Sequence, residues 1–260
     1  MVSVIMPAYN AGKTVRKSVE SVMAQTEKEW ELIAIDDGSS DDTADILAAL
    51  AASDGRIRFF RNGENRGVSY TRNRAVALAE GEWIAFLDSD DQWLPEKLQK
   101  QLALAAEYPE MVICYTASAF TDEAGKAYQY VMPAVERLTY PMLVRRNLMS
   151  CSSVMIRSRV MKTLAMPGDH MHEDYFIWLS VLRTHGVAYG INEPLLIYRI
   201  SKHSKSSGRL KSARMLFCSY RAVGYRPAAA CALVLRYAFY SVGKRRKIYS
   251  SEKTEKKERL

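Results

Sequence analysis

The sequence predicts an α/β protein with a Rossmann-like, mostly parallel and doubly wound sheet. Short apolar segments at residues 2–6, 32–35, 57–60 and 83–87 have the pattern of strands that are buried on both faces. Segments with apolar residues three or four positions apart separate them, and the connecting loops are only a few residues long. The 260 residues, 48% hydrophobic and 25% charged, fit one large globular domain or one domain with an appendage.

Each predicted element in residues 1–117 has its own sequence signal. Strand 2–6 ends at Pro7, and Asn65-Arg66-Gly67 leads from the third strand into a helix. Pro95 is expected to begin the last helix of this half, because proline suits the first helical turn. The helix positions expected to face the core are apolar: Val15, Val19, Val22 and Met23, then Ile46, Leu47 and Leu50, then Tyr70, Val76 and Leu78, then Leu98, Leu102 and Ala105.

The regular alternation of strand and helix patterns ends after residue 117. Residues 118–209 are therefore expected to form an α+β half of the same domain. Asp122 and Gly125 predict a hairpin turn between two strands. The other predicted elements are a strand at 152–156, a helix that begins at Glu173, and two strands at 187–191 and 195–200.

Three clusters of acids stand at the ends of predicted elements: Asp36-Asp37, Asp88-Ser89-Asp90-Asp91 and Glu173-Asp174. The first two follow buried strands, and ligands of open α/β sheets bind at the carboxyl ends of strands. Crowded carboxylates repel one another unless a cation joins them, and phosphate oxygens often complete the shell of such an ion. The alternative is that the second cluster only caps the next helix and that the third only interacts with a helix dipole.

Five motifs together resemble the inverting family-two glycosyltransferases, which have the GT-A fold. The motifs are Val4-Ile5-Met6-Pro7-Ala8-Tyr9-Asn10, Asp36-Asp37-Gly38-Ser39, Asn65-Arg66-Gly67, Asp88-Ser89-Asp90-Asp91 and Glu173-Asp174-Tyr175. The resemblance covers about residues 1–205, and it is strongest to bacterial enzymes that build O-antigen or teichuronic acid units on a lipid carrier. The segment 189–195 followed by Tyr198-Arg199 is typical of that branch.

This resemblance implies transfer of a hexose, with glucose as the first choice, from a UDP-sugar to a sugar on undecaprenyl diphosphate through a β-1,3 linkage. Residues 1–117 would then bind the nucleotide sugar, and residues 118–209 would bind the acceptor and supply the base. The residues implied in nucleotide-sugar binding are Pro7, Ala8 and Tyr9 on the base, Asp36 and Asp37 at the uracil edge, Arg72 near base and ribose, and Asp88 near the ribose.

The resemblance also implies a metal site and a base. Asp88 and Asp90 form the Asp-x-Asp motif that would bind Mn²⁺ or Mg²⁺, and His203 would reach the metal or the diphosphate. Asp174 would be the general base, with Glu173 beside it as support. These parts agree with the chemistry, because an inverting transfer needs a base for the acceptor hydroxyl and a cation for the leaving diphosphate.

Two other classes of function would use parts of the same sequence. A sugar nucleotidyltransferase needs a glycine-rich phosphate loop after its first strand, and residues 7–12 contain one glycine. A nucleic-acid-binding protein would use the basic tail and would leave three acid clusters without a purpose, so no nucleic-acid partner is expected.

The basic character of the chain lies in its tail, residues 210–260, which is predicted to be a basic amphipathic helix with a disordered end. From Arg199 onward there are 17 basic and 3 acidic residues, whereas the chain as a whole has a net charge of +8. Residues 228–242 carry one charge, Arg236, but these fifteen residues are too few to span a bilayer. We therefore expect a cytoplasmic protein, peripheral on the inner face of the cytoplasmic membrane, whose tail binds the anionic surface. The alternative is a helix packed on the catalytic body.

Overall fold

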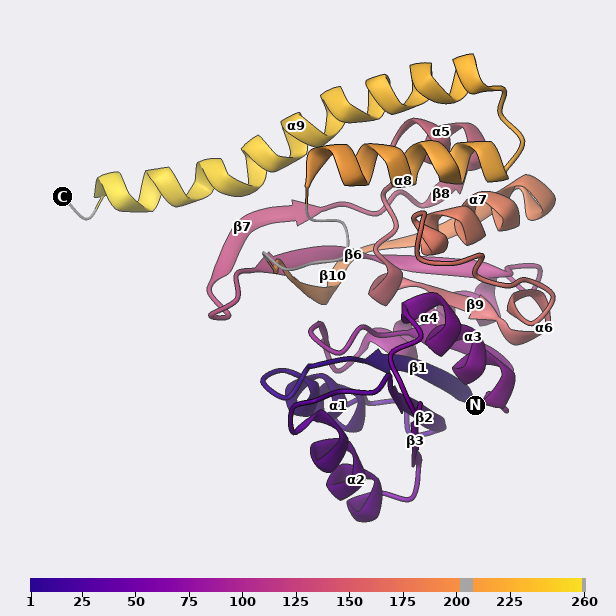
Figure 1. Cartoon of the computed structure of the whole chain (residues 1–260), viewed down its shortest axis with the longest axis vertical. Coiled ribbons are helices and arrows are strands. Elements are labelled where there is room, and N and C mark those ends of the chain that lie inside the picture. The colour runs from indigo at the N-terminus through magenta and orange to yellow at the C-terminus, as the bar shows by residue number, and fades with distance from the viewer. Residues whose placement is uncertain (202–207, 259–260) are drawn as a thin grey trace.

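The computed structural model, which describes residues 1–201 and 208–258, has the predicted α/β architecture with helices on both sides of one sheet (Figure 1). The strands follow the chain in the order β1 (Val2–Ala8), β2 (Trp30–Asp36), β3 (Ile57–Arg61), β4 (Trp83–Phe86), β5 (Gln92–Trp93), β6 (Ile113–Thr121), β7 (Ala127–Met132), β8 (Arg137–Thr139), β9 (Met155–Arg157) and β10 (Val187–Arg199). The helices are α1 (Val15–Met23), α2 (Thr43–Ser53), α3 (Val68–Leu78), α4 (Lys97–Glu107), α5 (Tyr140–Arg145), α6 (Ser158–Met161), α7 (Glu173–His185), α8 (Arg209–Ala222) and α9 (Pro227–Glu258), with a 3₁₀ turn η1 at Cys151–Ser153.

The order of strands in the sheet is β3-β2-β1-β4-β9-β6-β10-β5. Strands β1, β2, β3 and β4 pair in parallel, and so do β6 and β10. Strand β9 is antiparallel to both of its neighbours and joins the two halves of the chain into one sheet. The carboxyl ends of β1, β2 and β4 therefore lie at one edge, where the sequence predicts ligand binding.

Strand β10 differs from the prediction of two separate strands. It is continuous over Val187–Arg199, and its register against β6 shifts on both sides of Pro194. Proline lacks the N–H that a regular ladder of hydrogen bonds needs. The pairing with β6 is therefore irregular at Pro194, but the strand continues past it.

The central strands pack on both faces, as their continuous apolar pattern predicts. In β1, Val4 and Met6 belong to one core cluster and Ile5 belongs to the other. In the same way Ala85 and Phe86 of β4 belong to opposite clusters. The alternation follows from the twofold period of a strand. Helices α1, α2 and α4 cover one face, whereas α3, α7 and α8 cover the other.

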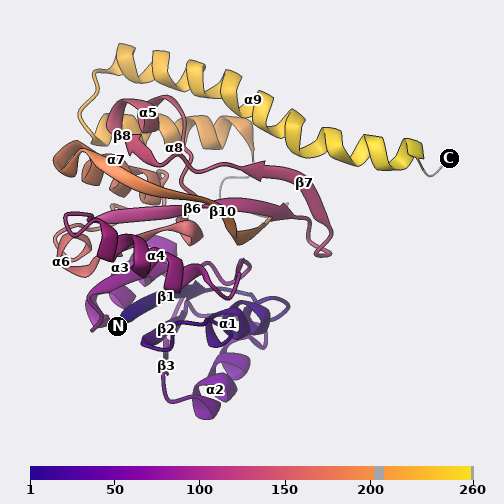
Figure 2. The ribbon, with the colours of Figure 1, turned by 180° about the vertical axis from the view of Figure 1, so that it is seen from behind.

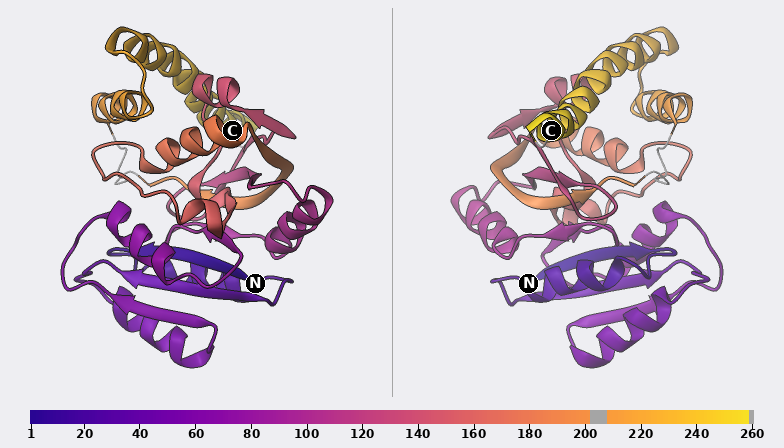
Figure 3. Two further views of the ribbon diagram at one scale, coloured as in Figure 1. Left: turned by 90° about the vertical axis from the view of Figure 1, so that its right-hand side faces the viewer. Right: turned by 90° about the vertical axis from the view of Figure 1, so that its left-hand side faces the viewer.

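The tail forms two helices that pack on the catalytic body. Figures 2 and 3 show α9 next to α8 at the outer side of the chain, and Figure 2 shows its last turns extending away from the other elements. Helix α9 contacts α8, β7 and α5. The structure thus shows a tail that packs on the catalytic body, whereas membrane binding of the tail stays a prediction. It also continues α9 to Glu258, through residues that were predicted to be disordered.

Helix α9 also carries an exposed apolar stripe. Leu235, Phe239 and Val242 are 64%, 82% and 47% exposed and lie four and three positions apart on one side of the helix. None of the helices in the described part of the chain has the length and apolar character needed to cross a membrane.

Candidate active site

A cleft of about 900 Å³ lies at the predicted edge of the sheet. Its walls come from the end of β1, the start of α3, the segment after β4, η1, the start of α7, and helices α8 and α9. Most of the predicted site residues line this one cleft: Pro7, Ala8, Tyr9, Asp37, Arg72, Asp88, Asp90, Glu173 and Asp174. The fold therefore brings Asp37, of the first acid cluster, into one cleft with Glu173 and Asp174, which lie more than 130 residues later in the chain.

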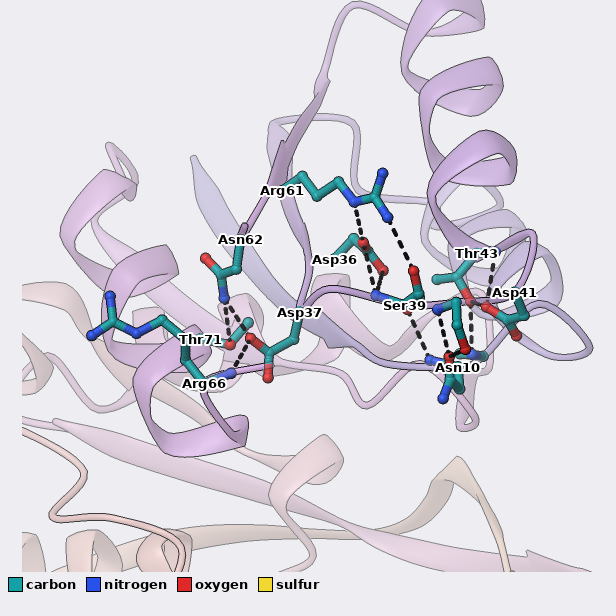
Figure 4. A network of polar contacts seen from close by, with 12 residues as sticks. Asn10, Asp36, Asp37, Ser39, Asp41, Thr43, Arg61, Asn62, Arg66 and Thr71 are labelled. Atoms are coloured by element: carbon teal, nitrogen blue, oxygen red, sulfur yellow. Dashed lines mark hydrogen bonds and ion pairs between the residues drawn. The ribbon is translucent and has the colours of Figure 1, made fainter. Parts of the chain in front are cut away.

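Asp37 organises the loop that enters α3. Its carboxylate accepts hydrogen bonds from Asn62 Nδ2 at 2.6 Å and from the Arg66 backbone N–H at 3.0 Å (Figure 4). It also accepts from the Gly67 backbone N–H at 2.8 Å. A carboxylate has about four acceptor positions, so these bonds leave room for one more donor. Contact with the base of a nucleotide stays a prediction for Asp37.

Asp36 has a different place from its neighbour. Its side chain is fully buried, pairs with Arg61 Nε at 3.0 Å and accepts from the Ser39 backbone N–H. Figure 4 shows the carboxylates of Asp36 and Asp37 pointing to different partners. Successive residues of a strand point to opposite sides, so Asp36 does not line the cleft. The structure thus gives Asp36 a supporting place under this loop. Its contact with the uracil edge stays a prediction.

Arg72 joins the two acid clusters of the cleft. Its guanidinium pairs with Asp88 and, at 2.7 Å, with Glu173 Oε1. The Arg72 and Glu173 side chains are almost fully buried, whereas Asp88 is partly exposed. The sequence predicts Arg72 near the base and ribose, which stays a prediction. The structure adds that Arg72 fixes Asp88 relative to the start of α7.

The segment after β4 holds Asp90 and Asp91 in different surroundings. Burial and the nearby Asp88 carboxylate raise the pKa of Asp90 to about 6, and Asp90 lines the cleft. Asp91 points inward, where it accepts from Ser152 Oγ at 2.6 Å and from the Arg199 backbone N–H at 2.9 Å. Asp91 therefore ties β10 and η1 to the motif, a role that the sequence did not indicate.

Asp88 and Asp90 fit a divalent ion that is shared with a substrate. Among residues 1–201 and 208–258 no group of three or more His, Cys, Asp or Glu side chains could hold a metal by itself. Two carboxylates completed by phosphate oxygens are the usual arrangement for Mg²⁺ at a nucleotide. The raised pKa of Asp90 also fits, because a cation would offset the repulsion from Asp88. His203, the third predicted ligand, lies outside the described residues.

Asp174 and Glu173 begin α7 but have different surroundings. Glu173 is held by Arg72, whereas Asp174 is partly exposed to the cleft and accepts from the Tyr175 backbone N–H at 2.7 Å. Burial and the neighbouring Glu173 charge raise the pKa of Asp174. A raised pKa makes a carboxylate a better proton acceptor near neutral pH. Of the two acids, Asp174 is thus the one whose surroundings suit the predicted base.

The structure adds a clamp between the two halves that the sequence did not predict. The Asp169 carboxylate accepts from the backbone N–H groups of Val68 and Ser69, both at 3.0 Å, and so caps α3 from a distant loop. Gly67 has a φ of +86°, and a Cβ there would lie 2.2 Å from Asp169 Oδ2, so only glycine fits. The clamp fixes the loop before Glu173-Asp174 against the helix that carries Arg72. No local pattern marks such a long-range cap.

Two tyrosines from the tail end of the chain also line the cleft. Tyr237 and Tyr240 of α9 belong to its wall, together with Ser212 of α8 and His172. His172 Nε2 lies 3.3 Å from the Ser212 backbone oxygen. The sequence favours a membrane-binding tail and does not indicate that the tail helices close this side of the cleft.

Comparisons with known proteins identify the family. The family model described as "Glycosyl transferase family 2" matches residues 3–164 of this chain. The chain is similar to the glycosyltransferase TuaG of Bacillus subtilis (36% identity, 86% of this chain and 88% of TuaG). It is also similar to the Escherichia coli UDP-Glc:α-D-GlcNAc-diphosphoundecaprenol β-1,3-glucosyltransferase WfgD (34% identity, 82% of this chain and 83% of WfgD).

Solved structures confirm the GT-A fold. Staphylococcus aureus TarS 1–349 in complex with UDP-GlcNAc matches with a TM-score of 0.70 at 19% identity, over 90% of this chain and 70% of that one. The Pyrobaculum calidifontis mannosyltransferase PcManGT in complex with GDP-Man and Mn²⁺ matches with a TM-score of 0.67 at 15% identity, over 90% and 68% of the two chains. With the family match over residues 3–164 and relatives above 30% identity, the chain is a member of glycosyl transferase family 2.

Proposed function

We propose that the protein transfers glucose from UDP-glucose to a sugar on a lipid diphosphate, in one displacement with inversion, during synthesis of a bacterial surface polysaccharide. One observation carries this proposal: Asp88 and Asp90 line the same cleft as Asp174. A leaving diphosphate can bind on one side of this cleft, and an acceptor hydroxyl can lose its proton on the other.

The chain's own residues account for most of the chemistry. Asp174 takes the proton of the attacking hydroxyl, and Arg72 holds Asp88 and Glu173 in place. Tyr9, half exposed at the end of β1, offers a face for the nucleotide base. A Mn²⁺ or Mg²⁺ ion bound by Asp90 and Asp88 would offset the charge that grows on the diphosphate. The cleft needs no Ser or Cys nucleophile, because a single displacement forms no bond to the enzyme.

The donor, acceptor and linkage rest on the relatives. WfgD is named for transfer from UDP-Glc to GlcNAc on diphosphoundecaprenol through a β-1,3 linkage, and TuaG is named for teichuronic acid biosynthesis. At 34–36% identity these names support a hexose donor and a lipid-linked acceptor for this chain. Membership of a glycosyltransferase family argues against a sugar nucleotidyltransferase.

The experiment is a donor screen with a synthetic GlcNAc diphosphate that carries a short alkyl chain. We expect turnover with UDP-glucose that exceeds turnover with UDP-galactose, UDP-GlcNAc and GDP-mannose, and a 1,3-linked product. Transfer from GDP-mannose alone, or release of UDP with no sugar on the acceptor, would contradict the proposal.

We further propose that the protein works as a peripheral protein at the cytoplasmic face of the membrane, through the stripe of Leu235, Phe239 and Val242. The stripe faces away from the cleft side of α9, which carries Tyr237 and Tyr240. The tail is strongly basic, so it suits an anionic surface. Residues 227–260 cannot simply be deleted in a test, because α9 is also a wall of the cleft.

Replacing Leu235, Phe239 and Val242 together by serine is expected to weaken co-sedimentation with anionic vesicles at least several-fold, because the three side chains contribute much of the buried apolar area. High salt should release the wild-type protein, since surface attraction is screened. Leu94→Ser, a change at an exposed leucine far from α9 in sequence, is the matched control. Equal binding of the triple variant and this control would rule out the stripe as the docking surface.

A further inference from the structure

The inner face of α9 presents polar and aromatic groups to the cleft. Tyr237, Tyr240 and Ser241, at positions i, i+3 and i+4, all belong to the cleft wall. The rings of Tyr237 and Tyr240 meet edge to face with centroids 6.3 Å apart. The family model matches residues 3–164, so these three side chains lie outside the matched part of the chain.

Tyr237 is placed to contact a ligand beside the base. Burial first, then Tyr220, Tyr240 and Asp174, raises the pKa of Tyr237, so its hydroxyl stays protonated and can donate. Within residues 1–201 and 208–258 this hydroxyl makes no hydrogen bond, and the Tyr237 side chain is partly exposed at the cleft wall. A tyrosine hydroxyl with one side in a wet cleft can donate to a ligand that binds there. A hydroxyl of a bound sugar would accept this bond.

Arg146 lies at the end of α5, next to the cleft residue Asn147. Its guanidinium lies over the Tyr240 ring at 5.0 Å from the centroid, and its side chain is exposed. It forms no ion pair with any acid in the described part of the chain. The contact with the ring restrains the guanidinium, and the planar fork of its N–H groups matches the oxygens of a phosphate.

We infer that the edge of the cleft between α5 and α9 is the acceptor subsite for a sugar diphosphate. Tyr237 positions the acceptor sugar beside Asp174, and Arg146, supported by Tyr240, binds the diphosphate that follows the sugar. This inference rests on the proposed function and assigns its acceptor to named residues.

The test compares two acceptors, a GlcNAc diphosphate with a short alkyl chain and the GlcNAc alkyl glycoside without diphosphate. Arg146→Ala should raise the KM for the diphosphate acceptor about 10-fold or more, because a charge-assisted bond to phosphate is lost. The KM for UDP-glucose and the KM for the glycoside should stay unchanged. Arg145→Ala, the adjacent exposed arginine, is the matched control and should leave all three constants unchanged. For Arg146→Lys, the KM for the diphosphate acceptor should lie between the values of the wild type and of Arg146→Ala.

Tyr237→Phe tests the sugar contact. It keeps the ring and removes the hydroxyl, so it should raise the KM for both acceptors several-fold while UDP-glucose binding stays intact. If Arg146→Ala behaves as Arg145→Ala while the wild type uses the diphosphate acceptor, the subsite is wrong and the proposed function stands. Equal loss on both acceptors in Arg146→Ala would also overturn the subsite. A wild-type enzyme with no activity on the diphosphate acceptor would overturn the proposed function and this inference with it.

Discussion

Asp174→Asn is expected to lower turnover by roughly 10²–10⁴-fold and to leave UDP-sugar affinity unchanged. Asparagine keeps the shape of the side chain and its bond from the Tyr175 N–H, but it cannot accept the proton of the acceptor hydroxyl. Single-turnover kinetics for the rate and calorimetric titration with UDP-glucose for the affinity would separate the two effects. Loss of donor affinity with unchanged turnover would make Asp174 a binding residue.

The turnover rate of the wild type should depend on pH through the ionisation of Asp174. The base works as the carboxylate, so the rate falls as the pH falls through its pKa. Because burial and Glu173 raise the pKa of Asp174, this fall should lie above the usual aspartate range, and it should disappear in Asp174→Asn.

Glu173→Gln is the matched variant at the adjacent acid. Glu173 pairs with buried Arg72, so removal of its charge leaves that arginine with Asp88 alone. We expect Glu173→Gln to lower thermal stability and donor affinity together, since the Arg72 contacts to Asp88 would shift. A larger loss of turnover in Glu173→Gln than in Asp174→Asn, with stability unchanged, would exchange the roles of the two acids.

Asp90→Ala is expected to abolish activity, because one of the two carboxylates for the divalent ion is lost while the fold survives. The same loss should follow removal of the metal from the wild type with EDTA. The folded-state pKa of Asp90 is about 6, above the ordinary aspartate value of 3.8. Ionisation of Asp90 therefore lowers the stability of the fold as the pH rises from the ordinary value through the folded-state value. In metal-free buffer at neutral pH the variant should therefore unfold at a temperature no lower than that of the wild type.

Mn²⁺ binding to the wild type should weaken below about pH 6, where Asp90 becomes protonated. Asp122→Ala, a change in the exposed hairpin turn, is the control for the general effect of losing an acid. Full turnover of Asp90→Ala in the presence of EDTA would exclude a metal role for Asp90.

The sheet and the main acids of the cleft follow from local sequence patterns. Buried strands read as continuous apolar runs, and their carboxyl ends mark where Asp37, Asp88 and Asp90 must lie. The split between Asp36 and Asp37 shows the limit of this reasoning. Both acids satisfy the pattern, but which of them faces the cleft depends on where β2 leaves the sheet and on the pairing with Arg61.

The features that the sequence did not predict depend on contacts between distant parts of the chain. Asp169 caps α3 across about 100 residues of sequence, and Asp91 bonds Arg199 across 108. The sequence predicts α9 to be a surface helix because residues 228–242 carry a single charge and a run of basic residues follows them. Its inner face becomes visible only when α9 packs on α8 and β7 and brings Tyr237 into the cleft.

The central claim is a single displacement in which Asp174 activates the acceptor. The anomeric configuration of the product tests it most directly, because one displacement inverts the reacting carbon. With UDP-α-D-glucose as the donor, proton NMR of the product should show only the β-glucoside, through the large coupling between its H1 and H2. An α-glucoside would require two displacements or front-face transfer, and it would contradict the account.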